Sequence, residues 1–288
     1  MNHKEIITEE AKGSIIEQFA YEVIDKLPSI SSYLAEKYEL IQHEGFQAAQ
    51  DVENEADLFI AKEWVDFVQT KFPSFNIDTE EALGKINISS RYTVRVDSID
   101  GSKHFRAGIP IFGSNISLRF DNETLFGACI DPMLRETYYA IKGKGAYRNG
   151  SKIAVSAVDS IQNAFIALEG PTSKLAKTNY LAFQSSSVVQ DFLKQNSFRV
   201  RDFGLGAFGI CLVANGSCAG YVDISGTTKT YDIEAALHIL QEAGGKFSDF
   251  VRPEINVQSI SDISNHVIIA SNGLIHQELL NILHTTVQ

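Results

Sequence analysis

The chain has little cysteine: its 288 residues include three, at Cys129, Cys211 and Cys218. An odd and sparse set argues against a disulfide framework, and none of the three has the spacing of a structural zinc site. We therefore expect three packed thiols in a protein of a reducing compartment, with the cytoplasm as its location.

Long apolar runs and an excess of basic residues are also missing. No uninterrupted apolar stretch approaches the roughly 18 residues of a membrane span, and the first residues, MNHKEIITEEAKG, are too charged for a signal peptide. The formal net charge is −11. We therefore expect neither a membrane nor a nucleic-acid polymer as partner, and an acidic protein that binds a phosphate ester needs cations to reverse the local field.

Hydrophobic residues make up an ordinary 44%, enough for one large domain or two that share a core. Apolar periodicity predicts helices over residues 5–27, 51–72, 180–195, 206–215 and 275–283. Leu27-Pro28-Ser29 predicts the end of the first helix, followed by a short helix around residues 33–38 and a loop through residues 43–45.

Alternating runs that end at the Asn149-Gly150 turn predict antiparallel strands before about residue 155. After that point strands alternate with helices, which predicts a mixed or parallel sheet. We expect an α+β or α/β fold whose two halves, residues 1–155 and 156–288, pack as one compact unit.

Two acidic residues, Asp97 and Asp100, lie where the strand predicted over residues 92–96 ends. Their carboxylates and the carbonyl of Ile99 are all-oxygen ligands, which suit Mg²⁺ before Zn²⁺. Gly101 and Ser102 follow with backbone N–H groups and a hydroxyl, which suit a phosphate. On these residues alone, a solvated Asp-rich turn explains the pattern equally well.

Other acids also have ordinary explanations. Asp57 lies beside the apolar stripe of its helix, where carboxylates are usually solvated boundary residues. Asp232 opens a helix, where an acid commonly caps the first turn and opposes the helix dipole. Glu80 and Glu81 follow a short predicted strand, and we expect Glu81 to be a plain surface acid.

The wider context favours a site. Residues 96–110, VDSIDGSKHFRAGIP, resemble the signature of the inositol monophosphatase family, roughly D-P-[IL]-D-G-T-x-N-F-x-x-G-x-P. The stretches ENEADLFIAKEW, GKGAYRNG, GLGAFGICLVANG, YDIEAALHILQEAGG and VIIASN resemble further family motifs, in the same order along nearly the whole chain. The chain departs from the family pattern at Asn54, Thr79, Ser98, Ser102, His104, Tyr231 and Glu234.

The resemblance implies a layered α-β-α-β-α sandwich and two or three Mg²⁺ ions. One ion would be held by Glu80, Asp97 and the Ile99 carbonyl. A second would be held by Asp97, Asp100 and Asp232, and a third, looser ion would attach at Glu80. Two ions that bridge a phosphate stabilise the attacking and leaving oxygens of an in-line displacement.

The resemblance also implies catalytic and binding roles. Ser102 and Asp57 would pair to help a metal-activated water attack, with Glu80 contributing, and Gly101 and Ser102 would bind the phosphate. The remaining expected substrate contacts are Lys103, Gly206, Ala207 and Asp223.

We therefore expect a Mg²⁺-dependent, lithium-sensitive phosphatase, a homodimer that acts on a small phosphorylated metabolite such as an inositol monophosphate. The alternative activities are those of a 3′(2′),5′-bisphosphate nucleotidase, a histidinol-phosphatase or a fructose-1,6-bisphosphatase. A relative that kept the fold, binds phosphate esters and lost turnover is the non-enzyme alternative. Release of phosphate in the presence of Mg²⁺ discriminates the enzymes from this last possibility.

Overall fold

The structure, a computed structural model, describes residues 14–42, 46–81, 89–170, 189–191, 193–204, 206–249 and 266–287. The helices are α2 (Ile15–Ile41), α3 (Phe46–Lys71), α4 (Ser102–Arg106), α7 (Ala207–Ala214), α8 (Thr230–Glu242) and α9 (His276–Val287). The first sheet contains β1 (Asn76–Thr79), β2 (Tyr92–Asp100), β3 (Gly113–Phe120), β4 (Glu123–Asp131), β5 (Glu136–Ile141), β6 (Gly145–Arg148) and β7 (Ser151–Ile153). The second contains β8 (Phe165–Glu169), β9 (Arg199–Asp202), β10 (Gly220–Thr228), β11 (Lys246–Asp249) and β12 (His266–Ser271).

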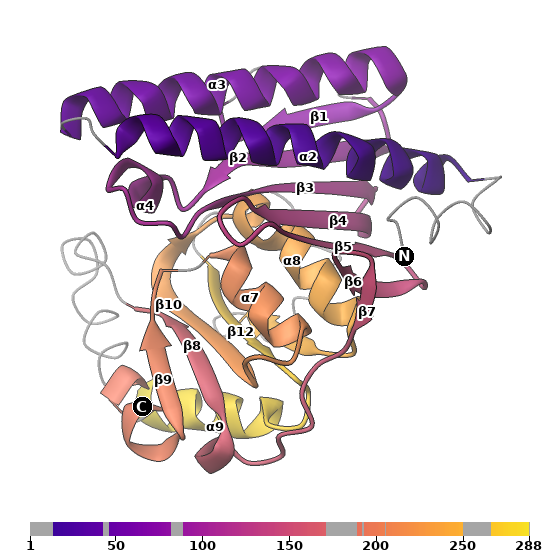
Figure 1. Cartoon of the computed structure of the whole chain (residues 1–288). Helices are drawn as coiled ribbons and strands as arrows, with labels where there is room; N and C mark the ends of the chain where they lie inside the picture. The colour runs from indigo at the N-terminus through magenta and orange to yellow at the C-terminus, as the bar shows by residue number, and fades with distance from the viewer. Residues whose placement is uncertain are drawn as a thin grey trace.

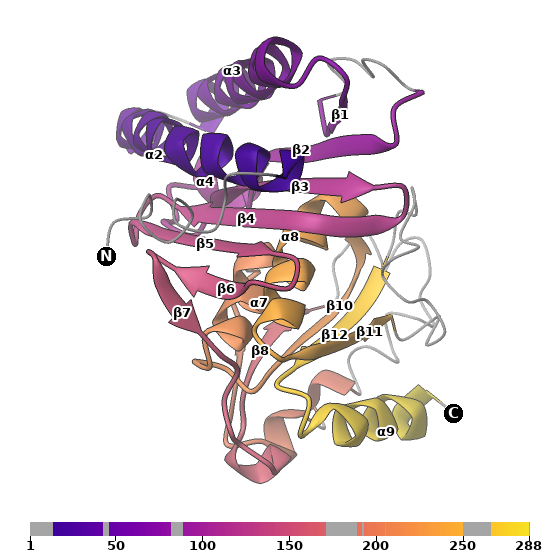
Figure 2. The ribbon, with the colours of Figure 1, turned by 90° about the vertical axis from the view of Figure 1, so that its right-hand side faces the viewer.

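These elements form five layers, as the expected sandwich requires (Figure 1). Helices α2 and α3 cover one face of the first sheet, and α7 and α8 lie between the two sheets. Helix α9 lies on the outer side of the second sheet, as the rotated view also shows (Figure 2). The layered α-β-α-β-α arrangement is therefore confirmed.

The first sheet runs in the order β1 to β7, and its neighbours are antiparallel except β1 and β2, which are parallel. Asn149 and Gly150 both have positive φ in the β6–β7 hairpin, as the predicted two-residue turn requires. The second sheet has the order β11-β12-β10-β8-β9 and mixes parallel with antiparallel pairs, which confirms the predicted mixed sheet.

Helix α8 joins the two sheets into one core. It is buried along most of its length, with Ile233, Ala236, Leu237 and Leu240 fully covered. Because one helix serves both sheets, the first turn of α8 is held against the first sheet by packing on two sides. The strands of the first sheet all precede residue 155 and those of the second all follow it, and the division into residues 1–155 and 156–288 stays a prediction.

The predicted end of the first helix at Pro28 is wrong. Helix α2 continues through Pro28 to Ile41, and no separate short helix follows it in the described residues. A proline inside a helix costs about 3 kcal/mol, but burial of a large aliphatic side chain stabilises by about 1.5–3 kcal/mol. Leu27, Ile30 and Leu34 are all buried around Pro28, so packing outweighs the local cost.

Several expectations fall partly outside the described residues, namely the loop through residues 43–45 and most of the helix over residues 180–195. The other helices appear as α3, α7 and α9, each with bounds that differ by a few residues from the prediction. Among the described helices, none is both long and apolar enough to cross a bilayer.

Candidate metal and phosphate site

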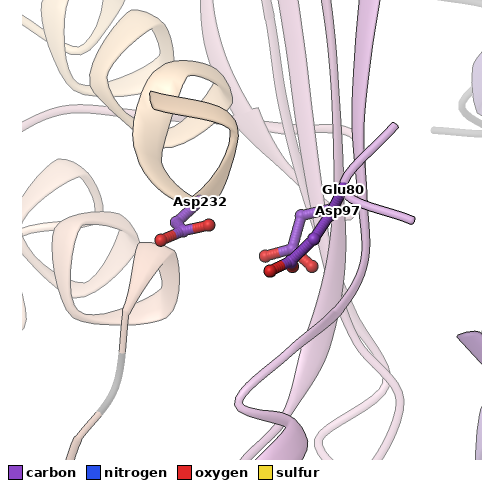
Figure 3. Close-up of side chains that lie close together, drawn as sticks. All are labelled: Glu80, Asp97 and Asp232. Carbon is purple, nitrogen blue, oxygen red and sulfur yellow. The ribbon is translucent and has the colours of Figure 1, made fainter. Parts of the chain in front are cut away.

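Three carboxylates from separate elements meet between the first sheet and α8. Glu80 follows β1, Asp97 lies in β2 and Asp232 lies in the first turn of α8 (Figure 3). Each offers an oxygen, and the three oxygens lie within 4.8 Å of one another. Parallel pairing of Thr79 with Val96 places Glu80 beside Asp97, and the Glu80 N–H extends this pairing by donating to the Val96 carbonyl at 3.3 Å.

Asp97 is the buried centre of this cluster. Its side chain is 2% exposed, and its Oδ1 has no hydrogen-bond partner among the described residues. Burial first, and then the charges of Asp100, Asp232 and Glu80, raise the pKa of Asp97 well above its usual range. An orphaned, buried carboxylate oxygen that faces other carboxylates fits a hard divalent cation with oxygen ligands.

Asp100 reaches the site because β2 contains a bulge. Asp97 pairs with Asn115 and Asp100 with Gly113, so three steps on β2 match two on β3. In a regular strand, residues three apart point to opposite faces, and the extra residue turns the second carboxylate toward the first. Asp100 lies outside the three-oxygen cluster but acts on Asp97 through its charge.

The N-terminal end of α7 holds Asp100 from the other side. Its Oδ2 accepts the Ala207 N–H at 2.9 Å. Gly206 has a φ of +51°, and a Cβ at that position would lie 2.3 Å from the Asp100 carboxylate. The close approach therefore requires glycine at residue 206.

A cationic side chain lies at the exposed edge of the cluster. The Lys229 ammonium is 3.1 Å from Glu80 Oε1, and the Tyr231 hydroxyl donates to the same oxygen at 3.4 Å. The Lys229 N–H also donates to Asp232 Oδ2 at 2.7 Å, so Asp232 caps the first turn of α8 as well as facing the cluster. Lys229 was not predicted from the sequence, although its position three residues before Asp232 places it at the same helix end.

Beside the carboxylates, Gly101 and Ser102 begin the short helix α4. Gly101 has a φ of +84°, and a Cβ there would lie 2.8 Å from the Ile111 carbonyl. Nine polar side chains line a pocket of about 180 Å³ at this point: Asp100, Ser102, Lys103, His104, Glu169, Ser225, Thr227, Thr228 and Asp232. The pocket therefore borders both the turn at Gly101 and Ser102, which is the expected phosphate loop, and the carboxylate cluster.

Sequence comparison identifies the family. A sequence model of the inositol monophosphatase family matches residues 15–288. The chain belongs to this family. A fructose-1,6-bisphosphatase/inositol-1-monophosphatase of Thermotoga maritima is 31% identical over 241 residues, 83% of this chain and 85% of the relative.

Two further similarities bear on function. The Nus factor SuhB of Haemophilus influenzae is 27% identical over 221 residues, which cover 76% of this chain and 77% of that protein. The solved IMPase of Thermotoga maritima superposes with a TM-score of 0.72 at 26% identity, covering 94% of this chain and 98% of that one. These similarities indicate a phosphatase fold and leave the substrate of this inositol monophosphatase family member open.

The expected substrate contacts differ in their surroundings. Lys103 lines the pocket. The Gly206 N–H donates to Glu169 and the Ala207 N–H to Asp100, so contact of either group with substrate stays a prediction. Asp223 is fully buried in β10, where it accepts hydrogen bonds from the Ser225 N–H at 2.9 Å and from the Thr228 hydroxyl.

Because Ser225 and Thr228 line the pocket, Asp223 shapes it through them. Glu169 also lines the pocket and was not predicted from the sequence. Burial, then the charges of Asp223, Asp202 and Asp100, raise the pKa of Glu169 to about 8. It lies at the end of β8, and strand ends are common places for ligand contacts in α/β folds.

Asp57 lies on α3 and faces other acids. Burial, followed by the charges of Glu81, Glu53 and Glu80, raises its pKa to about 8. The expectation that Glu81 is a plain surface acid is wrong, because burial also raises the pKa of Glu81 and its Oε2 is enclosed. Asp57 is therefore a half-buried carboxyl group that lies close enough to these acids for their charges to act on it, and its role at the site stays a prediction.

Ser102 is held by Glu53, a residue that was not predicted from the sequence. Its hydroxyl donates a hydrogen bond to Glu53, which lowers the pKa of that carboxylate against the larger, opposite effect of burial. A hydroxyl has one proton to donate, so in this structure Ser102 does not also donate to Asp57. The i, i+4 spacing of Glu53 and Asp57 on one helix face is the signal that could have identified Glu53.

Proposed function

We propose that the chain is a Mg²⁺-dependent phosphatase that hydrolyses a small phosphate monoester, of the kind that inositol monophosphate represents. The observation that carries this proposal is the meeting of Glu80, Asp97 and Asp232 around a buried carboxylate oxygen that has no partner in the described chain. Membership of the family supports the same class of reaction.

Mg²⁺ would be held by Glu80, Asp97, Asp100, Asp232 and the carbonyl of Ile99. Without cations these carboxylates repel one another, and this repulsion adds to burial in raising the pKa of Asp97 and Asp232. When bound, the ions would neutralise the cluster, polarise the phosphate and make a water more acidic. The four carboxylates supply enough oxygens and negative charge for two or three such ions.

The protein's own groups have distinct proposed roles. Gly101 and Ser102 bind phosphate oxygens at the start of α4, where the left-handed glycine turns the backbone toward the pocket. Asp57 takes a proton from the attacking water, with Ser102 helping to orient that water and Glu80 supporting it by charge. The enclosed position of Asp57 near Glu80 supports this assignment.

The substrate is a finer question. Glu169 lines the pocket beyond the phosphate loop and is an acceptor for hydroxyl groups, which supports a polyol phosphate. Lys103, which also lines the pocket, supports a bisphosphate, which is the activity that the name of the Thermotoga maritima relative also includes. Bisphosphate nucleotides and histidinol phosphate are the other candidates.

A panel assay tests the proposal. Purified protein is incubated with inositol monophosphate, fructose 1,6-bisphosphate, a 3′,5′-bisphosphate nucleotide and histidinol phosphate, and released phosphate is measured with Mg²⁺. We expect turnover that EDTA abolishes and Li⁺ inhibits. Binding of these esters without turnover would instead favour a silent homologue, and the similarity to Nus factor SuhB makes a role in protein binding the function to test next.

The proposal includes a homodimer in the cytoplasm. The three cysteines are free and buried, which agrees with a reducing environment. Sedimentation of the purified protein across a range of concentrations measures the assembly state directly, and cell fractionation measures the location.

A further inference from the structure

We propose that Glu53 is a positioning residue that sets the orientation of the Ser102 hydroxyl at the phosphate loop. The inference deepens the proposed function and rests on it. Nothing in the resemblance assigns a role to this position, which directly precedes the Asn54 departure.

Glu53 is a buried carboxylate with two partners on one short helix. Its side chain is 6% exposed and its Oε2 lies 2.7 Å from Arg106 Nε. The second partner is the Ser102 hydroxyl, which donates to the same carboxylate. Ser102 and Arg106 are the first and last residues of α4, four apart, so they lie on one helix face.

Glu53 therefore binds residues at both ends of α4 and holds that face of α4 against α3. Arg106 fixes the carboxylate, and the carboxylate fixes the hydroxyl. A serine hydroxyl rotates freely when it is exposed, whereas this one is aimed before any ligand arrives. Because the Ser102 hydroxyl is already oriented, the enzyme does not lose the rotational entropy of this group during each turnover.

A double-mutant cycle tests this role. Glu53→Gln keeps the shape and removes the charge that holds the Arg106–Glu53–Ser102 chain. We expect kcat to fall by roughly 10-fold with KM changed less than 2-fold, because the geometry matters most in the transition state. In the S102A background, the same Glu53→Gln change should cost less than 2-fold, since residues that act as a unit are non-additive.

Two comparisons isolate the effect. Glu55→Gln removes an exposed carboxylate of the same helix, which lies 2.8 Å from Lys37, and it should leave kcat unchanged. Asp57→Asn should lower kcat in both backgrounds, since Asp57 is the proposed base for the attacking water. If Glu53→Gln leaves the half-buried Arg106 guanidinium unpaired and the protein does not fold, the double variant Glu53→Gln/Arg106→Gln removes both charges. This double variant then takes the place of Glu53→Gln in the cycle.

A second readout does not depend on turnover. In denaturant unfolding, the double variant Ser102→Ala/Glu53→Gln should lose less free energy of unfolding than the sum of the losses in the two single variants. Absence of phosphate release by the wild-type protein would contradict the proposed function, and this unfolding cycle would still test the contact. Additive unfolding losses, an unchanged kcat in Glu53→Gln, or equal kcat losses in both backgrounds would overturn the role of Glu53.

Discussion

The ammonium of Lys229 lies 3.1 Å from the carboxylate of Glu80, at the edge of the cluster formed by Glu80, Asp97 and Asp232. One positive side chain therefore offsets part of the charge of three acids. Because the Lys229 backbone N–H also donates to the Asp232 carboxylate, the same residue contacts two of the proposed Mg²⁺ ligands. A divalent ion at this cluster would compete with the ammonium for Glu80.

The first prediction concerns this competition. Lys229→Gln should lower the half-saturating Mg²⁺ concentration roughly 2- to 5-fold, the range that an exposed ion pair accounts for. The metal-free variant should also unfold at a lower temperature, because the acids lose their internal counter-ion. Mg²⁺ titrations followed by phosphate release and by thermal unfolding measure both effects. Lys62→Gln, an exposed change on α3, is the control, and an unchanged Mg²⁺ requirement in Lys229→Gln would exclude competition.

The second prediction concerns the centre of the cluster. Asp97→Asn and Asp232→Asn should each abolish turnover, since each removes a proposed metal ligand. The metal-free fold should be as stable as the wild type or more stable, because the change removes a charge from a repelling group. Asp232→Asn keeps an oxygen that can accept the Lys229 N–H, so the first turn of α8 stays capped.

Activity and urea unfolding are measured on the same preparations, with the exposed Asp66→Asn as a matched control. Turnover close to that of the wild type in either variant would remove the two-metal proposal.

The third prediction is a pH dependence of the metal-free protein. Burial and neighbouring charges raise the pKa of Asp57 to about 8 and also raise that of Asp232, whereas an unfolded Asp titrates near about 3.9. The folded state therefore binds more protons between these values, so its stability falls as pH rises from about 4 to about 8. Each such proton changes the free energy of unfolding by about 1.4 kcal/mol per pH unit.

Unfolding in EDTA should accordingly show lower stability at pH 8 than at pH 6. Adding Mg²⁺ should reduce that difference, since bound cations favour the ionised carboxylates. Asp57→Asn should make the dependence of the free energy of unfolding on pH in EDTA shallower, by up to the amount that one bound proton contributes. A stability in EDTA that rises from pH 6 to pH 8 would show that these groups are ionised in the folded, metal-free state.

The sequence pointed to Glu80, Asp97 and Asp232, which the structure brings together, because the resemblance assigns them motif by motif. It also predicted the strand next to Asp97 and the Asn149-Gly150 turn, because both depend on local backbone preferences. Local rules failed at Pro28, where the cost of a missing N–H is smaller than the burial of the helix face around it.

The remaining site features depend on contacts between distant segments. Glu80 meets Lys229 across 149 residues, and Asp100 meets Ala207 across 107. Neither residue type signals its partner, since an exposed lysine or a backbone N–H has no pattern of its own in the sequence. Glu53 is intermediate, because its helix face was predictable and its contact with α4 was not.

The last prediction addresses the substrate through two residues of the pocket, Glu169 and Lys103. Glu169 offers acceptor oxygens to hydroxyl groups and disfavours a second phosphate, whereas Lys103 favours that phosphate. Above pH 8, where Glu169 is ionised, Glu169→Gln should raise the KM for inositol monophosphate roughly 10-fold, in keeping with one hydrogen bond to a charged group, and lower the KM for fructose 1,6-bisphosphate.

Lys103→Met should do the reverse, with a higher KM for the bisphosphate and little change for the monoester. Opposite shifts of the two substrates within each variant exclude general damage to the site, because damage would raise both KM values together. Parallel shifts in both variants would mean that neither side chain contacts the part of the substrate beyond the reacting phosphate. The pocket would then select its substrate through its shape and its backbone groups.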